Sequence, residues 1–186
     1  FLFDCGANFG FYSLFVAALK NENKVYSFEA SSKTYLDLQK NISLNNFKSI
    51  IPINLAVSDT KNLEVEFKES KNDWESSMIN TNFDILKTTK IKTTTIDSIL
   101  ENNTNILKEF NIVIKLDVEG HEMNVIKGSK NLTRKYSPMF IIEFSKFISD
   151  KDYNLLRDFL QENNYVIYDP NYEEINLEIV SKKLLE

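Results

Sequence analysis

The chain opens with an apolar strand that runs into an acid and a glycine-containing turn, and this order of residues constrains the fold more than any other feature. Residues 1–4 are predicted to form a buried strand, and one face of a helix follows in Phe11, Leu14, Phe15 and Ala18. Gly6 and Gly10 lie between the two, where strand turns into helix. Glycines there let the backbone approach a ligand closely, and the next helix presents the positive end of its dipole. The pattern predicts a nucleotide-type cofactor site.

A second acidic residue, Glu29, lies where a nucleotide-type cofactor site places a carboxylate. Residues 24–28 are predicted to form a strand that ends at Glu29, nineteen positions after Gly10. In a Rossmann-like unit a carboxylate near this position holds the ribose hydroxyls. The dinucleotide fingerprint needs glycines at positions 6, 8 and 11, but Asn8 and Phe11 stand at two of them, which disfavours NAD. The pattern Asp-x-Gly-x-Asn-x-Gly is instead similar to that of methyltransferases that use S-adenosylmethionine (SAM).

The remaining segments alternate between strand and helix patterns. Further strands are expected at 50–55, 111–116, 139–144 and 165–168, and helices at 11–20, 33–45, 121–132 and 151–163. This order predicts an α/β fold with a single Rossmann-like doubly wound sheet, mostly parallel, closed by an antiparallel hairpin through residues 177–180. Pro52 suits a third strand at the edge of the sheet. We expect one domain over residues 1–186.

The alternation breaks between residues 60 and 100. Leu63, Val65 and Phe67 alternate with polar residues, and residues 91–96 resemble a threonine-rich strand, so we predict an inserted β-hairpin. The stretch between them carries Trp74 and the pair Ser76 and Ser77. It either shapes the site or is a surface loop pinned by the tryptophan.

A second strand-to-helix turn carries acids and the chain's single histidine. Residues 112–116 are predicted to form a buried strand, followed by Asp117, Glu119 and His121. Neighbouring first and fourth strands would place this turn and the glycine turn at one edge of the sheet, where open α/β sheets bind ligands. The three side chains are candidate bases, although an acid-rich turn also complements a helix dipole. Lys115 lies on the same strand face as Asp117 and either supports the site or simply pairs with that carboxylate.

The composition and charge of the chain limit the classes of partner that we expect it to bind. The net charge is −5 and the pI is about 5.1, which gives no footprint for nucleic acid. Cys5 is the single cysteine, so we interpret it as a packing residue and expect no metal site. No apolar run approaches the roughly 20 residues that span a bilayer. We expect a cytoplasmic protein, and the sequence leaves the oligomeric state open.

Several blocks, in order along nearly the whole chain, resemble the FkbM-type methyltransferases. They are residues 4–13 with the glycine turn, Phe28-Glu29-Ala30, Ala56-Val57-Ser58-Asp59, residues 115–122 with Lys115 and His121, Gly128 and Ile142-Glu143. The resemblance implies SAM as cofactor and methyl transfer to a hydroxyl of a sugar, polyketide or other small molecule. Members usually carry helices before the first strand, so we expect a lead-in segment before Phe1. Alternatives are a non-catalytic SAM-binding module and a Rossmann-type enzyme that uses NAD.

The motif spacing and the resemblance together assign residues to the site. The cofactor is expected to contact Asp4, Gly6, Ala7, Asn8, Gly10, Tyr12, Ser13, Glu29, Ala30, Ser58, Asp59 and Asp117. Ser58 and Asp59 flank adenine in this interpretation, and the alternative for them is a helix cap. The catalytic candidates are His121, Asp117 and Glu119, with His121 slightly preferred as the general base.

Overall fold

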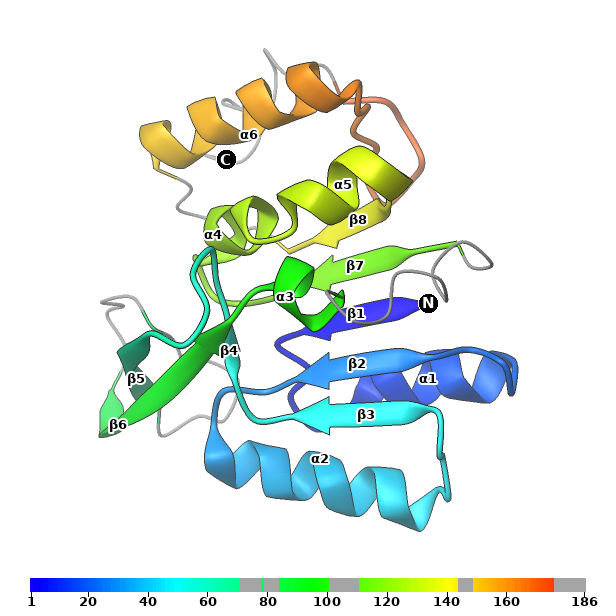
Figure 1. Ribbon diagram of the computed structural model, residues 1–186, viewed down its shortest axis with the longest axis vertical. Helices are drawn as coiled ribbons and strands as arrows, with labels where there is room; N and C mark the ends of the chain where they lie inside the picture. The colour runs from blue at the N-terminus through cyan, green and yellow to red at the C-terminus, as the bar shows by residue number, and fades with distance from the viewer. Residues whose placement is uncertain (71–77, 79–83, 101–110, 144–148, 176–186) are drawn as a thin grey trace. The chain divides into compact units, whose positions relative to one another are not determined.

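The computed structural model describes residues 1–70, 78, 84–100, 111–143 and 149–175 (Figure 1). The chain divides into two compact units, Phe1–Glu143 and Phe144–Glu186. The first unit contains both predicted turns. The single domain over residues 1–186 stays a prediction.

A five-stranded parallel sheet forms the centre of the first unit. Its strands are β1 (Leu2–Cys5), β2 (Val25–Phe28), β3 (Ile50–Ile53), β7 (Val113–Leu116) and β8 (Met139–Ile142). They lie in the order β3-β2-β1-β7-β8, and each neighbouring pair is parallel. The strand order reverses between β1 and β7, so the turns after these two strands meet at a topological switch point. The α/β prediction is confirmed, and Pro52 lies on the edge strand as predicted.

Two helices pack against the sheet through one apolar cluster. They are α1 (Phe11–Leu19) and α2 (Ser32–Leu44). Leu2 and Val25 from the strands pack with Ala17 of α1 and Leu38 of α2. Each of these four side chains is almost completely buried. This packing fixes the start of α1 directly after the glycine turn.

The inserted β-hairpin is confirmed, and it belongs to a second sheet. The chain leaves β3 and forms β4 (Ala56–Val57), β5 (Glu64–Ser70) and β6 (Ile85–Thr94) in the order β4-β6-β5. Figure 1 shows this sheet beside the arrowheads of β1 and β2. The predicted strand over 91–96 is too long at its end, because Ile96 begins α3 (Ile96–Leu100). The backbone N–H of Ser98 donates to Thr95 Oγ1 at 3.0 Å, which caps that helix. Trp74, Ser76 and Ser77 lie outside the described residues.

The single helix predicted over 121–132 is wrong, because the chain forms α4 (Glu122–Lys127) and α5 (Lys130–Tyr136). The break falls at Gly128, where an added Cβ would lie 2.0 Å from the carbonyl oxygen of Ser58. The carboxylate of Asp97 accepts the backbone N–H groups of Asn131 and Leu132, both at 2.9 Å, and so caps α5. Two contacts from distant parts of the chain therefore end one helix and start the next.

The described part of the second unit contains α6 (Asp150–Asn163) and a tight turn. Ser149 caps α6, because its Oγ accepts the N–H of Asp152 at 3.1 Å. The strand predicted over 165–168 is wrong in extent, since only Tyr168 forms an isolated antiparallel bridge, with Glu174. Asp169 Oδ1 accepts the N–H groups of Asn171 and Glu173, which folds the backbone into a turn. The closing strand at 177–180 lies outside the described residues.

Candidate functional site

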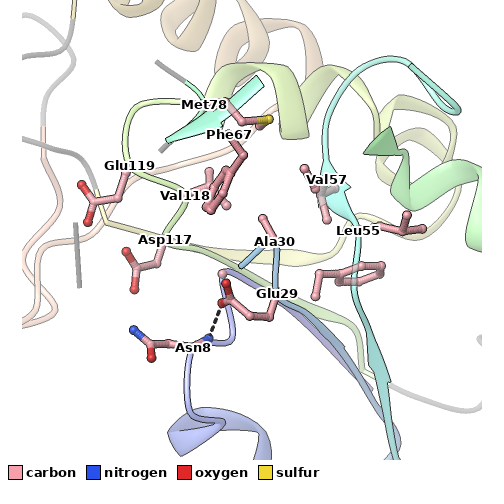
Figure 2. A pocket seen from close by; sticks show the side chains of 13 residues that line it. Asn8, Glu29, Ala30, Leu55, Val57, Phe67, Met78, Asp117, Val118 and Glu119 are labelled. Carbon is pink, nitrogen blue, oxygen red and sulfur yellow. Dashed lines mark hydrogen bonds between the residues drawn. The ribbon is translucent and has the colours of Figure 1, made fainter. Parts of the chain in front are cut away.

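A pocket lies where the first sheet's switch point faces the second sheet (Figure 2). It has an empty volume of about 630 Å³, part of it open to solvent. In Figure 2 polar side chains (Asn8, Glu29, Asp117 and Glu119) gather on one side and apolar ones (Leu55, Val57, Phe67, Met78 and Val118) on the other. The pocket can therefore hold a ligand with one polar and one apolar part.

The first turn is held by hydrogen bonds to the end of β2. The N–H groups of Gly6 and Ala7 donate to the carbonyl oxygen of Phe28, at 3.0 and 2.8 Å. Gly6 has φ +75°, and an added Cβ would lie 1.9 Å from the carbonyl oxygen of Asp117. Glycine is thus required where the first turn meets the second. Asn8 also has a positive φ of 50°, a conformation that asparagine tolerates.

Glu29 places a buried carboxylate at the end of β2. Its Oε2 accepts the N–H of Asn8 and its Oε1 accepts the N–H of Ser31, both at 2.8 Å. Burial raises the pKa of Glu29 to about 7, and the two N–H groups oppose that rise. Each carboxylate oxygen can still accept a second hydrogen bond. The side chain of Asn54 donates to the carbonyl oxygens of Glu29 and Ala30, at 2.8 and 3.1 Å. The sequence interpretation missed Asn54.

The second turn, after β7, brings Asp117, Val118 and Glu119 to the pocket wall. Glu119 has φ +50° and Gly120 has φ +90°. A left-handed glutamate is uncommon, and such strain clusters at functional sites. The turn is held from behind by the buried Glu122, whose Oε1 accepts the N–H of Gly120 at 2.9 Å. Burial raises the pKa of Glu122, and backbone N–H groups oppose that rise.

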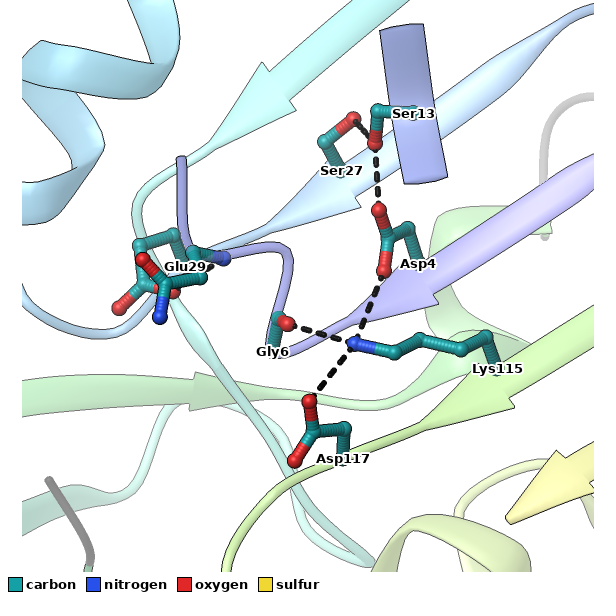
Figure 3. A network of polar contacts seen from close by, with 8 residues as sticks. Asp4, Gly6, Ser13, Ser27, Glu29, Lys115 and Asp117 are labelled. Carbon is teal, nitrogen blue, oxygen red and sulfur yellow. Dashed lines mark hydrogen bonds and ion pairs between the residues drawn. The ribbon is translucent and has the colours of Figure 1, made fainter. Parts of the chain in front are cut away.

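A largely buried polar network joins the two turns that line the pocket (Figure 3). Lys115 Nζ lies 2.9 Å from Gly6 O, 3.1 Å from Asp117 Oδ2 and 3.4 Å from Asp4 Oδ1. The other oxygen of Asp4 accepts the hydroxyl of Ser13 at 2.6 Å. Burial raises the pKa of Asp4, while Lys115 and Ser13 oppose that rise. Burial alone would lower the pKa of Lys115, but the two carboxylates raise it above its usual range, so the ammonium stays charged. The predicted pairing of Lys115 with Asp117 is confirmed.

His121 lies at the start of α4 and contacts Ser58, the residue directly after β4. Its Nε2 is 3.0 Å from Ser58 Oγ, and Ser58 Oγ also donates to Asp59 Oδ1 at 3.2 Å. No helix follows Ser58 and Asp59, so their interpretation as a helix cap is wrong. The contact links the second turn to the strand that forms the apolar wall.

The structure separates the predicted site residues into two groups. Six line the pocket, namely Gly6, Asn8, Glu29, Ala30, Asp117 and Glu119. The others lie behind it or beside it among the described residues, namely Asp4, Ala7, Gly10, Tyr12, Ser13, Ser58, Asp59 and His121. The sequence analysis did not assign seven of the lining residues to the site, namely Phe28, Leu55, Ala56, Val57, Phe67, Met78 and Val118. The block at Ala56 and Val57 and the stretch with Met78 were noticed, but nothing in their residue types points to a ligand.

The fold is a Rossmann-like α/β fold with a pocket at the switch point of its parallel sheet. The family model described as "Methyltransferase FkbM domain" matches residues 4–167, so the chain belongs to the FkbM methyltransferase family. No curated protein matches the chain. The fold is similar to the crystal structure of methyltransferase FkbM from Methylobacillus flagellatus KT, with TM-score 0.59 and 19% identity over 89% of this chain and 38% of that one. This chain thus spans about two fifths of that protein's length.

Among the residues that the structure describes, no helix has the length and apolar character needed to span a membrane. Nor do they contain a group of three or more His, Cys, Asp or Glu side chains arranged to hold a metal ion.

Proposed function

We propose that this protein binds SAM and transfers its methyl group to a hydroxyl of a small molecule or glycan, in the cytoplasm. The observation that carries the proposal is the meeting of Glu29 with the turn from Gly6 to Asn8 at one pocket. Family membership supports methyl transfer, and the pocket supports a nucleotide-type cofactor.

The residues present fit SAM. The Glu29 carboxylate has acceptor capacity left for ribose hydroxyls after its two backbone bonds. The apolar wall with Ala56, Val57 and Phe67 suits an adenine ring. Gly6 and Asn8 would lie along the methionine part, and Asp117 would lie beside it. Ser13 supports the site from behind, since it holds Asp4.

Methyl transfer to a hydroxyl requires that the two reactants be held in position and that a group accept the hydroxyl proton. When bound, SAM supplies a methyl group on a positively charged sulfur, which a hydroxyl oxygen can attack in line. Asp117 and Glu119 line the pocket and can accept the proton that this hydroxyl loses. His121 is the third candidate base, and its Nε2 is engaged with Ser58 in this structure. We favour Asp117 or Glu119, because they already lie on the pocket wall.

The first experiment is isothermal titration of the protein with SAM, S-adenosylhomocysteine and NAD, followed by mass spectrometry of a panel of sugar and polyketide hydroxyls incubated with SAM. We expect SAM and S-adenosylhomocysteine to bind and NAD not to bind. Binding of NAD alone would overturn the proposal. SAM binding without transfer to any compound in the panel would favour a non-catalytic SAM-binding module.

A further inference from the structure

Lys115 joins the two turns that form the pocket. It belongs to β7, yet its ammonium reaches the carbonyl oxygen of Gly6 in the turn after β1, at 2.9 Å. It also contacts Asp117 Oδ2, in the turn after its own strand, at 3.1 Å. In Figure 3 these contacts radiate from one nitrogen atom. An ammonium has three N–H groups, and Asp4 Oδ1 at 3.4 Å faces the third.

The backbones of the two turns approach each other closely beside Lys115. Gly6 approaches the carbonyl of Asp117 so closely that no Cβ fits between the two turns. The N–H of Asp117 donates to Cys5 O at 3.2 Å, which continues the pairing of β1 with β7. Lys115 adds a further polar link between the two turns, through Gly6 O and Asp117 Oδ2.

The two carboxylates that contact Lys115 differ in their exposure to solvent. Asp4 is fully buried and Lys115 is 6% exposed, whereas the side chain of Asp117 is one third exposed. Asp4 therefore neutralises the ammonium inside the protein and Asp117 reaches toward the pocket. Lys115 Nζ also lies 5.3 Å from the centre of the Tyr12 ring on α1, within the range of a cation–π contact.

We propose that Lys115 is a positioning residue that fixes the turn from Gly6 to Asn8 and the Asp117 carboxylate relative to each other. It does not line the pocket and acts through the two turns. The inference rests on the proposed function for its link to SAM, while the coupling of the turns stands on geometry alone. Loss of Lys115 would loosen both turns together and leave the rest of the sheet in place.

The test must distinguish a role of Lys115 in positioning the two turns from a general contribution to the stability of the core. Lys115→Met leaves the buried Asp4 without its cation, which strongly destabilises a fold. The double variant Asp4→Asn/Lys115→Met removes that buried charge, and Asp4→Asn alone is its matched control. Lys90→Met, which removes a lysine paired with Glu64 at the surface at 3.6 Å, controls for the substitution itself.

Hydrogen exchange measured by NMR on the apo proteins is the primary readout. In the double variant we expect the amides of Ala7 and Asn8 in the first turn and of Asp117 and Gly120 in the second to exchange at least about tenfold faster than in Asp4→Asn. The amides that pair β2 with β3 should keep their rates. Unchanged exchange at the turns, faster exchange at one turn only, or a uniform increase over the whole sheet would each overturn the proposal.

Titration with S-adenosylhomocysteine is the second readout. We expect the double variant to bind about tenfold or more weakly than Asp4→Asn, because the turn that meets the ligand is no longer fixed. Equal affinity in the two variants would overturn the link between Lys115 and the cofactor. If the unaltered protein fails to bind this compound, the proposed function fails, and the exchange rates still decide whether Lys115 couples the turns.

Discussion

The two turns at the pocket have similar backbones but are held in different ways. Both contain positive φ angles, at Gly6, Asn8 and Gly10 in the first and at Glu119 and Gly120 in the second. The first uses residue types that tolerate this conformation, and it is held by backbone bonds to Phe28, by the Glu29 carboxylate at Asn8 N–H and by Lys115 at Gly6 O. The second forces a glutamate into it and is fixed by the buried side chains of Lys115 and Glu122. The first turn therefore adopts its backbone with residue types that tolerate it, and the second presents charged side chains on a strained backbone.

The largest effect should come from Gly6→Ala. The new Cβ would meet the carbonyl oxygen of Asp117 at 1.9 Å, in a backbone conformation that alanine disfavours. We expect the free energy of unfolding to fall by more than about 3 kcal/mol, measured by denaturant unfolding.

Gly10→Ala is the control for this prediction. Its Cβ would meet the flexible end of Leu38 at 2.5 Å, at φ +91°. The loss should be smaller, about 1–2 kcal/mol, because a side chain can move where a backbone carbonyl cannot. Equal losses at the two glycines would contradict the close contact between the turns.

The second turn should affect turnover more than stability. Asp117→Asn should lower turnover by about 10²–10⁴-fold if its carboxylate is the base. His121→Ala should have the smaller effect, since His121 contacts Ser58 and does not line the pocket. The measurement is methyl transfer at saturating SAM to an acceptor found in the hydroxyl panel. Full turnover in Asp117→Asn together with a large loss in His121→Ala would return the base role to the histidine.

The smallest effect should come from relieving the strain at Glu119. Glu119→Gly removes the side chain from a residue with φ +50°. We expect the free energy of unfolding to rise by up to about 1 kcal/mol, because relief of the strain exceeds the entropy that glycine adds to the unfolded chain. Turnover should fall, because the lining carboxylate is lost. Glu119→Gln keeps the strained conformation and serves as the control. A loss of stability in Glu119→Gly would show that the side chain supports the fold.

The difference between the two turns also explains which parts of the structure could be predicted from the sequence. Gly6, Asn8 and Glu29 lie in local patterns with a known spacing, so the first turn, its carboxylate and the parallel sheet could be predicted. The reach of Lys115 to Gly6 depends on how β1 aligns with β7, about 110 positions away in sequence. The break at Gly128 depends on the Ser58 carbonyl, and the apolar wall on a hairpin that folds back over the sheet. Such long-range contacts leave little trace in local residue patterns.

The central claim is that Glu29 binds the ribose hydroxyls of SAM. The pH dependence of the binding affinity tests this claim most directly. The pKa of Glu29 is raised from 4.5 to about 7 by burial. The folded protein therefore takes up a proton as pH falls through 7, and without ligand Glu29 contributes more stability at pH 5.5 than at pH 8. Hydroxyl donors prefer the ionised carboxylate, so binding should weaken below pH 7.

The measurement is calorimetric titration with S-adenosylhomocysteine at pH 8 and pH 6, on the unaltered protein and on Glu29→Gln. For the unaltered protein we expect the affinity to fall by about tenfold from pH 8 to pH 6, with proton release on binding at pH 6. Glu29→Gln should bind more weakly at pH 8 and show no such pH dependence. Equal affinities at the two pH values in the unaltered protein, or an unchanged affinity in Glu29→Gln at pH 8, would contradict the account.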